Sequence, residues 1–166
     1  MLIPVSIEAL LLGAAPDKSV VVLRPYVDTS EEPRVLPIYI GMPEALAISM
    51  AIEGKTKERP QTHDLTMDLV DCLGGKITSA IIDRVDGMTF YARLVVEQDG
   101  TTYEVDARPS DALALCLRMR APMYVESPVF IAASIPFNAQ HDDFKERELE
   151  AFHEYIENID PEDFKR

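Results

Sequence analysis

The sequence lacks any apolar run close to the roughly 20 residues that a membrane-spanning helix needs, so no transmembrane segment is predicted. Its first ten residues have no basic start and include Glu8, which argues against a secretory signal peptide. Cysteine is scarce: Cys72 and Cys116 show no metal-ligand spacing, and we interpret both as small buried side chains in a reducing compartment. These absences predict a cytoplasmic protein.

Several signatures of catalysis or nucleic-acid binding are also missing. The sequence contains no Gly-rich phosphate loop, no Ser-His-Asp pattern, no Cys-His metal spacing and no basic segment interleaved with aromatics. The net charge of −13 argues against sequence-independent binding to phosphate backbones, which depends on Lys and Arg. From Gln140 onward, ten Asp and Glu stand against four Lys and Arg, so the acidity is strongest at the C-terminal end.

A length of 166 residues suits one domain with a short appendage. We place the domain at residues 1–135 and an acidic tail at 136–166, whose segment 142–158 has the pattern of an amphipathic helix. Alternation and turn signals predict strands at 3–11, 19–24, 35–40, 122–126 and 129–133. Helices are predicted from Pro43, from Pro109 and after an N-cap at Thr62, the last carrying Leu65, Leu69, Cys72 and Leu73.

Two Asp-Gly pairs predict a three-stranded meander over residues 76–107. If Asp86-Gly87 and Asp99-Gly100 are the two-residue turns, Val85 lies opposite Met88 and Arg93 lies opposite Asp106. One face of the meander is then expected in the core; it carries Ile81, Phe90, Ala92, Leu94, Val96, Tyr103 and Val105. The other face mixes charged residues with Ile82 and Val95, and we expect something to cover it in part.

The run from Tyr103 to Arg118 reads as a strand passing almost without a loop into a helix. Pro109 suits a first helical position, and Asp111 follows where a carboxylate favours the positive end of the helix. Polar side chains held between two rigid elements suit a binding or catalytic site, and they equally suit a structural junction. A similar strand, proline and helix start occurs at 38–48; we interpret this echo as coincidence rather than duplication.

Four segments together resemble the bifunctional nuclease family: residues 36–41, 44–48, 59–65 and 105–114, in that order. The resemblance spans about residues 1–135. It implies an α+β domain with a mixed or mostly antiparallel sheet and three packed helices, and a homo-oligomer, most simply a homodimer. The family name comes from plant members described as degrading both DNA and RNA, so the resemblance also implies a nuclease acting on nucleic acid or nucleotides.

The candidate residues are chosen by their chemistry at these motif positions. A nuclease uses either carboxylate-bound metals or a His and a cation in acid–base work. The predicted catalytic residues are Asp106, Asp111 and His63, and the predicted substrate-binding residues are Arg108, Arg59 and Ser110. A hard ion such as Mg²⁺ or Mn²⁺ would be held by Asp106, Asp111, Asp64 and Glu44.

Each carboxylate also has a structural interpretation. Asp106 opposite Arg93 would form a cross-strand ion pair. Asp111 and Glu44 would each stabilise the N-terminus of a proline-initiated helix. Two functions therefore stand side by side: a metal-dependent phosphodiesterase, and a non-catalytic module in which the same junction binds a small ligand or a protein partner.

Overall fold

The computed structural model describes residues 1–13, 19–27, 32–55 and 58–137. Its strands are β1 (Leu2–Leu11), β2 (Ser19–Pro25), β3 (Arg34–Ile40), β4 (Gly75–Asp86), β5 (Thr89–Gln98), β6 (Thr101–Ala107), β7 (Met123–Glu126) and β8 (Ile135–Pro136). Its helices are α1 (Met42–Ile52), α2 (Thr62–Cys72), α3 (Pro109–Met119) and α4 (Ser127–Ala133).

The strands form one mixed sheet in the order β6-β5-β4-β7-β1-β2-β3-β8. Within the described ranges, β4 and β7 are parallel and every other neighbouring pair is antiparallel. The predicted α+β class with a mostly antiparallel sheet is therefore confirmed.

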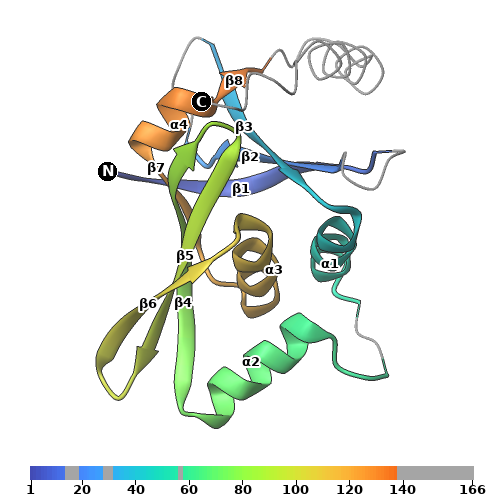
Figure 1. Cartoon of the computed structure of the whole chain (residues 1–166), viewed down its shortest axis with the longest axis vertical. Coiled ribbons are helices and arrows are strands. Elements are labelled where there is room, and N and C mark those ends of the chain that lie inside the picture. The colour runs from blue at the N-terminus through green and yellow to red at the C-terminus, as the bar shows by residue number, and fades with distance from the viewer. Residues whose placement is uncertain (14–18, 28–31, 56–57, 138–166) are drawn as a thin grey trace.

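The sheet contains two similar units that flank β7. In each unit, a three-stranded meander is followed directly by a helix: β1-β2-β3-α1 and β4-β5-β6-α3. Figure 1 shows the two meanders running at a steep angle to each other, with α1 and α3 in the angle between them. The two strand-proline-helix segments that resemble each other in sequence thus occupy equivalent places in the chain order.

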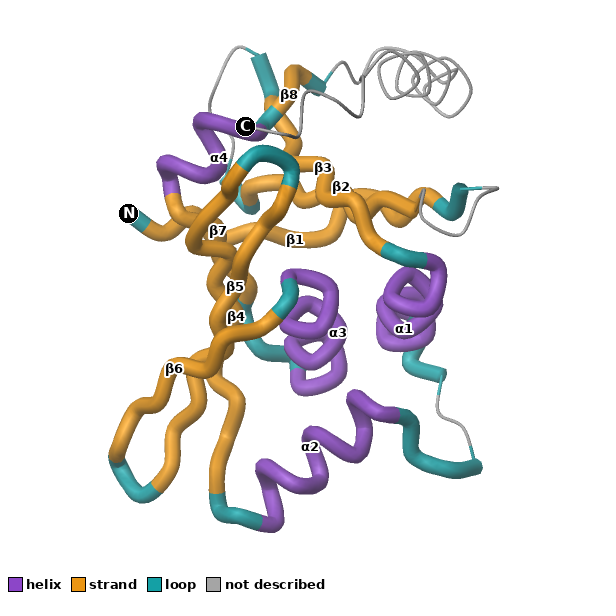
Figure 2. Tube along the Cα trace, viewed as in Figure 1, coloured by secondary structure: helices purple, strands orange, loops and turns teal. Residues whose placement is uncertain are grey.

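The core fills the space between the sheet and these two helices. Leu23 and Leu36 from the first meander, Ile82 from the second, and Ile48 and Leu113 from the helices are all almost fully buried. Helix α4 lies on the other side of β1–β3 from α1 and α3 (Figure 2). Because α4 also contacts β4 and β7, it covers part of the second face of the β4–β6 meander. Ile82 pairs with Ala92 and Ile81 pairs with Arg93, so Ile82 lies on the core face and Ile81 on the second face, the reverse of the prediction, because the register shifts by one residue along this ladder.

Helix α4 replaces a strand that was predicted at 129–133. Pro128 stands at the start of α4, as Pro43 and Pro109 stand at the starts of α1 and α3. Proline presets a helical φ and has no N–H to leave unpaired at the first turn. The β-branched residues after it favoured a strand, but this start and the burial of Val129 against the core outweigh that local preference.

The two Asp-Gly turns differ from each other. At Asp99-Gly100 both residues have positive φ, and the predicted pairing of Arg93 with Asp106 is confirmed. In the other hairpin only Gly87 has positive φ, and Asp86 pairs with Thr89. The turn residues there are Gly87-Met88, so the prediction that Val85 faces Met88 was wrong by one position. A turn with glycine first is one of the two preferred hairpin types.

Some residues predicted to be buried are exposed. Tyr103 and Val105 are each 48% exposed because β6 is an edge strand and α3 packs over β4 and β5. On α2, Leu65, Leu69 and Leu73 lie on the outer side of the helix, and Cys72 is exposed with them, so its predicted burial was wrong. Cys116 is buried as predicted, and burial raises its thiol pKa to about 12.

The amphipathic helix predicted at 142–158 lies outside the described residues. In the part of the chain that the structure does describe, no helix is long and apolar enough to cross a bilayer.

A buried and an exposed leucine test this core assignment. Leu36→Ala should lower the free energy of unfolding by about 2–5 kcal/mol, because Leu36 is fully buried and its loss leaves a cavity. Leu69→Ala, at 54% exposure, should change it by less than about 1 kcal/mol. Urea unfolding of both variants measures the difference, and equal losses would contradict the assignment.

Candidate functional site

The starts of α1 and α3 lie next to each other. Each helix follows a strand after a single residue, which is its N-cap: Gly41 for α1 and Arg108 for α3. Glu44 in the first turn of α1 folds back over Gly41, where an added Cβ would collide with its carboxylate. Because helix N-termini carry partial positive charge, these two starts favour anionic groups nearby.

Arg108 joins the two helix starts. Its Nε and Nη2 donate to the two carboxylate oxygens of Asp111 at 2.8 and 3.1 Å, and its Nη1 donates to Oε1 of Glu44 at 3.0 Å. The Arg108 side chain remains 65% exposed, whereas those of Asp111 and Glu44 are 32% and 20% exposed. A partly solvated guanidinium is therefore held in place by two more buried carboxylates.

His63 reaches the same cluster from α2. Its Nε2 lies 3.2 Å from Oδ1 of Asp111, and its side chain is only 15% exposed. Three helices thus contribute to one polar cluster, which we define as Glu44, His63, Arg108 and Asp111 and call the Arg108 cluster. Of the predicted catalytic residues, the structure brings His63 and Asp111 together.

A second ion pair lies beside the Arg108 cluster. Arg118, in the last turn of α3, donates through Nε to Oδ1 of Asp64 at 2.9 Å. Its Nη1 also donates to the carbonyl oxygens of Ala47 and Ala114. The other carboxylate oxygen of Asp64 accepts the backbone N–H of Gln61, so the N-cap of α2 is Gln61 rather than the predicted Thr62. Arg118 therefore connects α1, α2 and α3.

These contacts shift the pKa values of the carboxylates. Partial burial raises the pKa of Asp111, but hydrogen bonds from Arg108 and His63 outweigh it and leave the pKa below its ordinary value. The pKa of Asp64 is lowered, chiefly by the N–H of Gln61 and further by Arg118. The hydrogen bonds that Arg108 donates to Asp111 raise the pKa of Arg108. The carboxyl groups of Asp111 and Asp64 and the guanidinium of Arg108 are therefore ionised near neutral pH.

Asp106 lies apart from the Arg108 cluster. It lines a separate pocket on the second face of the meander, together with Asp83, Arg84, Tyr91, Arg93, Glu126 and Pro128. Although Arg93 faces Asp106 across the ladder, its guanidinium pairs with Asp83 at 2.6 Å, Glu104 at 3.4 Å and Glu126 at 3.5 Å. The ion pair predicted between Arg93 and Asp106 is thus replaced by pairs to other carboxylates.

The remaining predicted residues are Ser110, Arg59 and Asp64, which lie in three different surroundings. Ser110, 6% exposed, lines a pocket of about 490 Å³ together with Gly41, Glu44, Arg108 and Met88. Arg59 is exposed in the segment before α2 and is not a hydrogen-bond partner of the cluster carboxylates. Asp64 lies next to His63 in sequence, but its carboxylate is held by Arg118.

The arrangement does not fit the predicted Mg²⁺ or Mn²⁺ centre. Among the described residues, no three His, Cys, Asp or Glu side chains come close enough to hold one ion. The carboxylates of Glu44, Asp64 and Asp111 each accept from a guanidinium, and Asp106 lies elsewhere. The chemistry that this cluster can perform directly is acid–base work by histidine next to a cation.

Arg118 was missed by the sequence analysis. A basic residue in the last turn of a helix is ordinarily explained by the helix dipole. Its partner Asp64 is 54 residues away, and no local pattern indicates that pairing.

Comparison with known proteins gives two results. The model of the bifunctional nuclease domain family matches residues 21–138. Uncharacterized proteins from two strains of Mycobacterium tuberculosis, CDC 1551 / Oshkosh and H37Rv, are each 39% identical over 138 residues, which cover 80% of this chain and 82% of each relative. The region matched by the family model includes α1, α2 and α3, and therefore the whole Arg108 cluster.

The lowered pKa of Asp111 predicts a pH dependence of stability. The ionised carboxylate stabilises the fold above the ordinary value of 3.8, and this contribution is lost as the pH falls through the lower folded-state pKa. The difference in unfolding free energy between wild type and Asp111→Asn should thus shrink as the pH falls below about pH 4. Urea titrations measure it, with exposed Asp68→Asn as the matched control; the same pH profile in both would contradict the prediction.

Proposed function

Because the chain belongs to the bifunctional nuclease domain family, we propose that it hydrolyses phosphodiester bonds of nucleic acid or nucleotides at the Arg108 cluster. The observation that carries the proposal is the contact between His63 and Asp111 directly beside Arg108. A histidine oriented by a carboxylate can move a proton, and a guanidinium can stabilise the charge that develops on phosphate.

In this mechanism His63 acts as the general base. Nε2 faces Asp111, so Nδ1 is the ring nitrogen left to accept a proton from the attacking water. Asp111 fixes the orientation of the ring and stabilises the imidazolium that forms. The proton then passes to the leaving oxygen, which makes His63 the acid in the second half of the reaction.

Arg108 binds the phosphate in the adjacent pocket. A phosphate oxygen there would replace Glu44, which contributes a single hydrogen bond, while the two bonds to Asp111 keep the guanidinium in position. Ser110 and the N-terminus of α3 line the same pocket and suit an anion.

The alternative is a non-catalytic module that binds a small ligand or a protein partner. Two observations favour it: in the described structure all three bonds of Arg108 go to carboxylates, and the net charge of −13 repels polyanions. In that case the ion pairs act as a structural junction between α1 and α3.

The homo-oligomer implied by the family resemblance also remains a proposal. The outer side of α2, with Leu65, Leu69 and Leu73 each more than half exposed, is apolar surface that a second copy could cover. Light scattering on the purified protein, whose chain mass is 18.6 kDa, distinguishes a monomer from a dimer.

The enzyme proposal predicts that hydrolysis depends on Asp111 but not on Asp106. His63→Ala and Asp111→Asn should each lower hydrolysis of labelled RNA or DNA by roughly 10²–10⁴-fold, the usual contribution of a general base. Asp106→Asn, which changes a carboxylate in a different pocket, should retain wild-type activity. Rates are measured with purified protein in Mg²⁺, in Mn²⁺ and in EDTA, so that any dependence on metal is also detected.

The outcomes separate the two functions. Activity undiminished in both His63→Ala and Asp111→Asn would identify a contaminating nuclease and rule out the enzyme proposal. No hydrolysis by the wild type under any of the three conditions would favour the binding module.

A further inference from the structure

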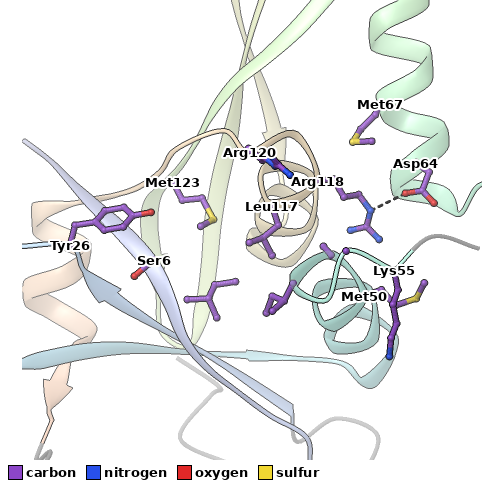
Figure 3. Close-up of a pocket in the computed structure, with 14 residues that line it drawn as sticks. Ser6, Tyr26, Met50, Lys55, Asp64, Met67, Leu117, Arg118, Arg120 and Met123 are labelled. Carbon is purple, nitrogen blue, oxygen red and sulfur yellow. Dashed lines mark hydrogen bonds and ion pairs between the residues drawn. The ribbon is translucent and has the colours of Figure 1, made fainter.

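A third pocket lies at the C-terminal end of α3, whereas the pocket at Arg108 and Ser110 lies at the start of this helix. It has a volume of about 670 Å³ and is bounded by β1, the end of α1, the start of α2 and the end of α3 (Figure 3). It shares no lining residue with the pocket at Arg108 and Ser110. Its size is that of ordinary small-molecule sites, which run from about 300 to 1,000 Å³.

Much of the wall of this pocket is apolar and adaptable. Three methionines, Met50, Met67 and Met123, come from α1, α2 and β7, and Leu117 lies among them (Figure 3). Methionine side chains are unbranched and polarizable, so they adapt to ligands of different shape. We call this site the methionine pocket.

Three cations line the same pocket. Lys55, Arg118 and Arg120 stand against a single carboxylate, that of Asp64, although the chain as a whole carries a net charge of −13. Arg118 is already held by Asp64 and two carbonyl oxygens. Lys55 pairs with the exposed Glu53, and Arg120 forms no ion pair within the described residues. Because Arg118 and Lys55 already have carboxylate partners, Arg120 is the cation of this pocket available to a ligand.

Arg120 occupies a backbone position that normally favours glycine. It ends α3 in the left-handed region, with φ 54° and ψ 35°. Strain at such positions concentrates where a side chain has a role. A cation at a helix C-terminus also favours the helix dipole, so a variant that removes the charge while suiting the backbone separates the two roles.

We propose that the methionine pocket binds a small organic anion with an apolar body. Its carboxylate or phosphate group contacts Arg120, and its apolar part lies against the methionines and Leu117. This proposal goes beyond the hydrolysis proposed above and does not depend on it, because the residues differ and the test measures binding alone.

The experiment uses 1-anilinonaphthalene-8-sulfonate as a fluorescent probe on the full chain. The probe should bind one site per chain, and dodecanoate should displace it. Dodecanol, which lacks the anion, and inorganic phosphate, which lacks the apolar body, should each compete at least tenfold less well.

Variants locate the bound anion. Arg120→Gly should weaken dodecanoate binding about tenfold without lowering the thermal midpoint, because glycine adopts positive φ readily. Lys55→Gln should change it by less than about twofold, because Lys55 is paired with Glu53 and lies away from Arg120 (Figure 3). Lys76→Gln removes an exposed lysine of β4 outside the pocket and should leave binding unchanged.

Two results would overturn the proposal. One is dodecanoate binding that is unchanged in Arg120→Gly. The other is an equal loss in Lys76→Gln, which would mean that the anion responds only to general charge.

Discussion

The packing of α1 against α3 in the angle of the sheet determines where the charged groups lie. Both helices begin with proline directly after a strand, so neither start has a loop in which to move. Their close approach leaves Glu44 and Asp111 with like charges near one another, and Arg108 bridges the two carboxylates and offsets their repulsion. Arg118, in the last turn of α3, also holds helices together, since it donates hydrogen bonds to Asp64 of α2 and to carbonyl oxygens of α1 and α3. Each of these two sets of polar contacts between the helices therefore depends on one guanidinium.

Local features of the sequence were sufficient for most of the elements. Alternation located β1–β6 to within a few residues, and the Asp99-Gly100 turn fixed the pairing of β5 with β6. Burial was harder, because alternation defines two faces without showing which face a helix will cover. Tyr103 and Val105 share the face of Leu94, yet α3 stops short of the edge strand. Helix α4 was predicted as a strand because the proline rule used for α1 and α3 was not applied to Pro128, which also stands at a helix start.

Local patterns also explain which part of the candidate site could be predicted from the sequence. Asp111, Arg108 and Ser110 are neighbours in sequence, and Glu44 belongs to the segment that resembles theirs, so their association was within reach of local reasoning. The contact of His63 with Asp111 joins residues 48 positions apart, and only the tertiary packing of α2 produces it. The separation of Asp106 from Asp111, however, was implicit in the sequence. Strand alternation had already placed Asp106 beside Arg93, on the face opposite to the one that α3 covers.

In a chain this acidic, a cation without a carboxylate partner is the kind of group most able to bind a small anion. In water a distant carboxylate is screened within about 8–10 Å at physiological salt, so the net charge of −13 mainly affects the approach of large polyanions. A small anion inside a partly enclosed pocket responds instead to the charges that line it. At Arg108 those charges are balanced by Glu44 and Asp111, and a phosphate must compete with them. At Arg120 no such competitor is present in the described structure. The two pockets therefore differ in whether one of their cations is left without a carboxylate partner among the described residues, and an incoming anion must displace a carboxylate at Arg108 but not at Arg120.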